Sequence, residues 1–141
     1  MSRFTCLNTL LKKRKLHHIR MEADGNCFYR AVCIAYHKDE DLHHLLRRTT
    51  MEHMLESIDT YARYFSSMQV MIGKLNANKR VGVWTTDMVN LVPHAVATML
   101  NCCIEVYTVT ETDEVVKYTF GEGQKIRLLR KNNQYDVLTK D

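Results

Sequence analysis

The residues with the clearest chemistry lie in one short segment, DGNCFYRAV, which runs from Asp24 to Val32. The Asp24-Gly25 pair is typical of a turn, and we expect Gly25 to adopt the positive φ that a sharp turn requires. From Cys27 onward the apolar residues recur at helical spacing. The segment therefore predicts a turn that delivers a cysteine to the start of a helix.

A cysteine at the start of a helix lies where unpaired backbone N–H groups and the helix dipole concentrate positive potential. This potential favours the thiolate, so we expect a lowered pKa and a nucleophilic Cys27. The alternative is that Cys27 is a small, buried and inert hydrophobe, which is common for cysteine. The same loop can stabilise an oxyanion, and its candidate donors are the backbone N–H groups of Asp24, Gly25, Asn26 and Cys27.

Helical spacing predicts three further helices along the chain. One covers about 40–58, with Leu42, Leu45, Leu46, Met54 and Leu55 on its buried side. The next covers about 61–75, with Tyr64, Phe65, Met68 and Ile72 turned inward. A last helix ends near Leu100 and is capped by Thr86 or Asp87; because Pro93 lies within it, this helix either kinks or begins late.

Short segments rich in Val, Ile, Tyr and Thr follow, separated by polar turns, and predict strands at 103–110, 114–120, 125–130 and 135–139. An earlier strand is expected at 16–22. Helices first and strands afterwards indicate an α+β fold with a small, mainly antiparallel sheet packed with helices. With 141 residues, the chain is long enough for one domain and its own core.

The net charge of +4 is concentrated at the front, where residues 1–20 hold six basic residues and no acid. We interpret 1–15 as a basic arm and 16–141 as a single domain. The arm is either a solvated segment or a patch for nucleic acid or an acidic membrane. We do not expect nucleic acid to be a partner, because no Gly-rich phosphate loop or aromatic–basic interleaving accompanies the charge.

Five cysteines, at positions 6, 27, 33, 102 and 103, form no CxxC pair. We interpret them as reduced thiols in the cytosol. No apolar run approaches the roughly 20 residues that span a bilayer. The first charges follow the short apolar stretch rather than precede it, so we expect no secretory signal.

DGNCFYRAV resembles the nucleophile motif of the ovarian tumour (OTU) family of papain-like cysteine proteases. Trp84, with the helix and strand that follow it, resembles the middle block of that family. NQYDVL, from Asn133 to Leu138, resembles its C-terminal NHYDxL block. The resemblance extends from about Leu16 to Leu138.

The resemblance implies a deubiquitinase, which cuts the bond after the C-terminal glycine of ubiquitin or a similar modifier. It implies Cys27 as nucleophile, Asp24 in the oxyanion loop and Asp136 as the acid that orients the catalytic histidine. Trp84 is either a core anchor or part of the substrate channel. No cofactor or metal is implied, the partner is ubiquitin or a ubiquitin-like modifier, and we expect a monomer that acts in the cytosol, or in the host cytosol if the source is a virus or an intracellular bacterium.

The sequence departs from the family at the histidine, whose position holds Gln134. Residues i and i+2 of a strand share a face, so Asp136 remains beside a side chain that cannot accept a proton at neutral pH. Two interpretations follow: an impaired enzyme that reacts slowly or recruits another histidine, or a pseudoenzyme that binds ubiquitin without cleaving it. Each histidine is a candidate substitute, with His94 after Trp84 and His17 and His18 before the nucleophile loop; the full set is His17, His18, His37, His43, His44, His53 and His94. Adjacent histidine pairs diverge, so zinc is not expected.

Overall fold

The computed structural model describes residues 3–4, 7–37, 39–79 and 91–140. Within these residues a six-stranded sheet has the order β1-β4-β3-β5-β6-β2. Every neighbouring pair is antiparallel except β3 with β5. The predicted α+β class with a mainly antiparallel sheet is therefore confirmed. The strands are β1 (Arg3–Phe4), β2 (Leu16–Ile19), β3 (Cys102–Val109), β4 (Val115–Phe120), β5 (Gln124–Lys131) and β6 (Gln134–Lys140).

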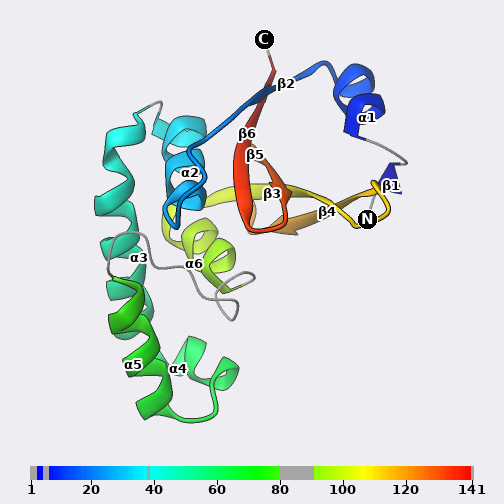
Figure 1. Ribbon diagram of the computed structural model, residues 1–141. Helices are drawn as coiled ribbons and strands as arrows, with labels where there is room; N and C mark the ends of the chain where they lie inside the picture. Colours follow the sequence, from blue (N-terminus) through cyan, green and yellow to red (C-terminus); the bar gives the residue numbers. More distant parts are fainter. Residues whose placement is uncertain (1–2, 5–6, 38, 80–90, 141) are drawn as a thin grey trace.

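Most of the helices lie on one side of this sheet (Figure 1). α2 and α6 pack directly on the strands, and α3 and α5 form a layer outside them. One 3₁₀ turn connects α2 to α3, and α4 with a second 3₁₀ turn connects α3 to α5. The bounds are α1 (Leu7–Arg14), α2 (Cys27–His37), α3 (His43–Glu56), α4 (Ile58–Tyr61), α5 (Met68–Asn78) and α6 (Leu91–Leu100), with 3₁₀ turns at Glu40–Leu42 and Ala62–Tyr64.

The sheet separates two clusters of buried side chains, because alternate residues of a strand face opposite sides. The larger cluster lies against α2 and α6 and includes Val106 of β3 and Leu128 of β5. Their sequence neighbours, Tyr107 and Leu129, face the other way and pack against Leu10 of α1. Three of the basic residues, Lys12, Lys13 and Arg14, thus form the last turn of a helix that is attached to the sheet through a fully buried leucine.

The predicted helix over 61–75 is interrupted, and its expected inward face is wrong. The chain leaves the helical conformation after Tyr64, and Ser67 then caps α5 by accepting a hydrogen bond from the N–H of Val70 at 3.1 Å. This new start rotates the helix relative to the expected register. Met71 and Leu75 are buried instead, whereas Tyr64, Met68 and Ile72 are exposed. Of the residues expected to face inward, only Phe65 packs against the core, and it is partly buried.

The helix expected over 40–58 exists as α3, but its buried side is only partly as predicted. Leu46 and Met54 are buried, while Leu45 is 60% exposed and Leu42 lies exposed in the preceding 3₁₀ turn. Polar side chains take the missing places on the buried side: His43, Arg47 and Thr50 lie there at helical spacing.

The described part of the last helix, α6, runs over Leu91–Leu100 and includes Pro93. The residues before Leu91, on which a late start depends, lie outside the described part of the chain. The proposed caps Thr86 and Asp87 lie outside the described residues. The four C-terminal strands agree with the predicted segments to within one residue at each end. No helix among the described residues is long and apolar enough to cross a membrane.

Candidate active site

The loop before α2 is shaped by the side chain of Asp24. Its Oδ1 accepts a hydrogen bond from the N–H of Asn26 at 2.9 Å, and its backbone carbonyl accepts one from the N–H of Cys27 at 3.3 Å. Cys27 is the first residue of α2, as predicted. The expected positive φ at Gly25 is wrong: among the described glycines only Gly121 and Gly123 have one, and the Asp24 side chain makes the turn instead.

The thiol of Cys27 lies against the start of β6. Its Sγ donates to the carbonyl of Asn133 at 3.4 Å and accepts a hydrogen bond from the N–H of Tyr135 at 3.3 Å. β2 pairs with β6 only as far as Val137, so these backbone groups lie on an edge that β2 does not cover. The structure thus brings the cysteine to both sequence neighbours of Gln134.

Gln134 and Asp136 share one face of β6, as the spacing predicts. The Nε2 of Gln134 donates to Oδ1 of Asp136 and to the carbonyl of Met21, each at 2.8 Å. The same Oδ1 accepts the N–H of Met21 at 2.8 Å. The amide of Gln134 therefore holds the carboxylate of Asp136. Gln134 itself occupies the position at which the resemblance to the family implies a histidine.

His18 reaches the second oxygen of this carboxylate. Its Nε2 lies 2.7 Å from Oδ2 of Asp136, and its side chain is one-third exposed. Another candidate base, His94, lies with its ring centroid 6.3 Å from that of Tyr61 in the helical layer. Among the described residues, no group of three or more His, Cys, Asp or Glu side chains is placed to hold a metal ion.

The expected lowering of the Cys27 pKa is wrong. Cys27 is only 4% exposed, and this burial raises the pKa of its thiol above the ordinary value. The hydrogen bond from Tyr135 lowers the pKa, but the negative charges of Asp24 and Asp136 raise it. The net shift of the Cys27 pKa is upward, which favours the thiol over the thiolate.

Both carboxylates of the site remain ionised. Burial alone would raise the pKa of Asp136, but the hydrogen bonds from Met21, Gln134 and His18 bring it below its usual value. Burial would also raise the pKa of Asp24, but the N–H of Asn26 and the guanidinium of Arg30 together lower it below its usual value. Arg30 in turn links Asp24, at 3.2 Å, to Glu40, at 3.3 Å.

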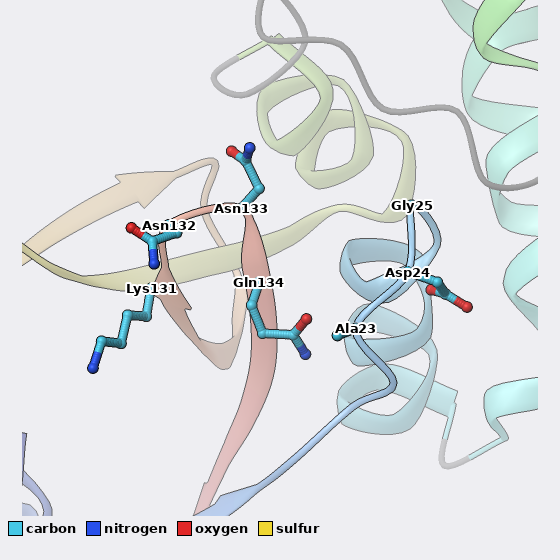
Figure 2. A pocket seen from close by; sticks show the side chains of 7 residues that line it. All are labelled: Ala23, Asp24, Gly25, Lys131, Asn132, Asn133 and Gln134. Carbon is cyan, nitrogen blue, oxygen red and sulfur yellow. The ribbon is translucent and has the colours of Figure 1, made fainter.

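A hollow of about 480 Å³ opens beside the site. Figure 2 shows the loop of Ala23, Asp24 and Gly25 along one side and the turn into β6 along the other, with the Gln134 side chain directed across it toward Ala23. Trp84, proposed as core anchor or channel residue, lies outside the described residues. The lining residues are Ala23, Asp24, Gly25, Lys131, Asn132, Asn133 and Gln134.

One buried residue of the site was not identified from the sequence. Arg47 of α3 lies beneath the nucleophile loop and is 1% exposed. Arg47 lies one helical turn after His43 and one before Met51, so these three residues share the buried face of α3. An arginine there is read as a surface residue unless its hydrogen-bond partners are known.

The site combines Cys27 at the start of a helix with Asp136 on the adjacent strand, two residues after Gln134. Together with this fold, that arrangement is the one of a papain-type cysteine protease. The family model for OTU-like cysteine proteases matches residues 22–133. The chain belongs to this family of OTU-like cysteine proteases.

Solved structures show the same fold. The OTU domain of OTUD1 is 24% identical, with a TM-score of 0.82 over 93% of this chain and 90% of that one. The OTU protease of Farallon virus is 17% identical, with a TM-score of 0.71 over 99% and 89%. The Hazara virus OTU, solved bound to ubiquitin, is 22% identical, with a TM-score of 0.71 over 88% and 80%. A search of the curated proteins gave no match.

Proposed function

We propose that this chain is a thiol-dependent deubiquitinase of reduced turnover, which attacks the bond after the C-terminal glycine of ubiquitin or a ubiquitin-like modifier through Cys27. One observation carries this proposal: the Cys27 sulfur contacts the backbone on both sides of residue 134. Asp136 is hydrogen-bonded to the side chain of the same residue. The hollow beside Gln134 offers room for an extended peptide.

In this reaction the small thiolate fraction of Cys27, which has lost its proton to water, forms a bond to the carbonyl carbon, and the carbonyl oxygen takes up the negative charge. The N–H of Gly25 donates to no other described residue and is therefore the loop donor available to that oxygen. The N–H groups of Asn26 and Cys27 already donate to Asp24. Of the four expected donors, Gly25 is thus the one that we assign to the oxyanion.

The second half of the reaction explains the reduced turnover. When the C–N bond breaks, the leaving amine needs a proton, and the water that later hydrolyses the thioester needs a base. Gln134 can do neither, and its amide is held by Asp136 and Met21. Loss of a triad histidine costs roughly 10³–10⁶ in rate, although a cysteine retains a small thiolate fraction.

A second function has its own support: a pseudoenzyme that binds ubiquitin and does not cut it. The raised pKa of Cys27 disfavours the nucleophilic thiolate, and Asp136 is already hydrogen-bonded by His18 and Gln134. Both features favour a site that does not react. Either function suits a monomer in the cytosol, where the four described cysteines, all unpaired, stay reduced.

Ubiquitin carrying a C-terminal electrophile distinguishes the two functions. We expect a covalent adduct on Cys27, with its rate increasing from pH 6 to 9, and very slow release of a ubiquitin-amide reporter. Binding without an adduct at any pH in this range would support the pseudoenzyme. Absence of both binding and adduct would reject ubiquitin as the partner.

A further inference from the structure

A charged side chain is buried under the nucleophile loop, outside the cysteine–carboxylate pair. Arg47 is among the largest fully buried side chains described. Burying a guanidinium is costly unless its donors are satisfied, and burial lowers the pKa of Arg47. Its hydrogen bonds therefore identify what such a costly arrangement maintains.

Two of these hydrogen bonds go to the loop itself. Nη2 donates to the carbonyl of Gly25 at 2.6 Å and to Oδ1 of Asn26 at 3.1 Å. Nη1 donates to the carbonyl of Asn78, at the end of α5, at 2.9 Å. The guanidinium also stacks over the ring of Tyr29, 4.5 Å from its centroid. The planar fork thus connects the loop to α2, α3 and α5.

These contacts fix one peptide unit from both sides. The carbonyl of Gly25 and the N–H of Asn26 belong to the same trans peptide, so they point in opposite directions. Arg47 holds the carbonyl, and Oδ1 of Asp24 holds the N–H at 2.9 Å. The preceding peptide is held through the carbonyl of Asp24, which leaves the N–H of Gly25 free of described partners beside the hollow.

We propose that Arg47 is a positioning residue of the site: it orients the Gly25–Asn26 peptide, so that the Gly25 N–H and the Cys27 thiol keep the geometry needed for acyl transfer. The inference rests on the proposed function for its catalytic consequence. Arginine suits the task because its planar fork serves several acceptors at once, whereas a lysine presents a compact point charge.

The first test measures the loop without any substrate. In Arg47→Lys, hydrogen exchange of the Asn26 and Cys27 amides should accelerate about tenfold, the equivalent of one net hydrogen bond. The exposed neighbour on the same helix supplies the control, and Arg48→Lys should leave this exchange unchanged. Unchanged loop exchange in folded Arg47→Lys would overturn the proposal.

The second test measures chemistry with the ubiquitin electrophile. Arg47→Lys should slow adduct formation about 10- to 100-fold, the scale expected for a displaced reacting group, and Arg48→Lys should not. A purely structural arginine would lower the melting temperature and leave the adduct rate of the folded protein unchanged, which would also overturn the proposal. If the unsubstituted chain forms no adduct, the proposed function fails, and loop exchange alone decides the role of Arg47.

Discussion

At the scale of single residues, Gln134 holds Asp136 in place and offers no group that accepts a proton at neutral pH. Its amide donates to Asp136 at 2.8 Å, as the N–H of a neutral imidazole can. The other side of an imidazole would offer a basic nitrogen, which an amide lacks. The site is therefore assembled around a side chain that orients groups but exchanges no proton.

The substitution Gln134→His should restore this transfer, because Asp136 and Cys27 are already in contact with residue 134 or its neighbours. We expect hydrolysis of a ubiquitin-amide reporter to rise by about 10³-fold or more. Gln134→Asn, which supplies no base, is the matched control and should stay at the original rate. A histidine variant as slow as this control would contradict our assignment of the site.

The pKa of Cys27 gives a second prediction at this scale. Because burial raises it, alkylation by iodoacetamide should increase with pH with a midpoint above the ordinary thiol value of about 8.5. Asp136→Asn removes a negative charge, so the thiolate becomes easier to form and the midpoint should fall. Asp113→Asn, in an exposed turn, should leave it unchanged. A midpoint below 8.5 in the unsubstituted chain would show that the end of α2 dominates instead.

The sequence predicted which residues meet but not their electrostatic state. The motif spacing alone placed Cys27 at a helix start and paired residue 134 with Asp136. The sign of the Cys27 pKa shift depends on its burial and on carboxylates more than 100 residues apart in the chain. Likewise, no local pattern shows that the Asp24 side chain, rather than a positive φ at Gly25, makes the turn.

At the scale of elements, the strands were predicted more closely than the helices. Alternation and β-branched residues mark strand ends directly, and the four C-terminal strands match their predicted bounds to within one residue. Helical spacing failed where polar residues are buried, as at Arg47, whose partners Gly25 and Asn78 are distant in sequence. It also failed at Ser67, a cap that restarts a helix within one apolar pattern.

The attachment of α1 can be tested through its one fully buried residue, Leu10. Leu10 packs with Leu16, Tyr107 and Leu129 on the face of the sheet opposite α2. Leu10→Ala should lower the free energy of unfolding by about 2–5 kcal/mol, measured by chemical denaturation. The exposed Asn8→Ala is the control. A loss no larger than that of the control would mean that α1 is not held on the sheet.

At the scale of the whole molecule, the site lies where the helical layer meets the sheet. α2 supplies Cys27, β6 supplies Asp136, β2 supplies His18 and α3 supplies Arg47. Three of these four elements lie within the first 56 residues, and the fourth is the last strand. Completion of the site therefore depends on the two ends of the chain coming together through the β2–β6 pair.

Two changes to the N-terminal segment 1–15 distinguish the effect of its charge from its contribution to stability. Neutralising the basic residues at positions 12–15 with glutamine should leave the melting temperature and the ubiquitin adduct rate unchanged, since these side chains are exposed. Deleting residues 1–15 should lower the melting temperature, because the deletion removes Leu10 and the β1–β4 pair. Equal stability of the deleted and intact chains would establish the segment as a dispensable arm.

The contact between Cys27 and β6 also affects how this protein can be inactivated. The sulfur accepts a hydrogen bond from the buried N–H of Tyr135. An alanine at position 27 would therefore leave this N–H without its acceptor. An unsatisfied buried donor costs about 1–3 kcal/mol, and we expect Cys27→Ala to melt below Cys27→Ser, whose hydroxyl can replace the bond. Equal melting temperatures would contradict this. An inactive variant for trapping bound partners is therefore better made with serine, because alanine would remove the nucleophile and also lower the stability of the protein.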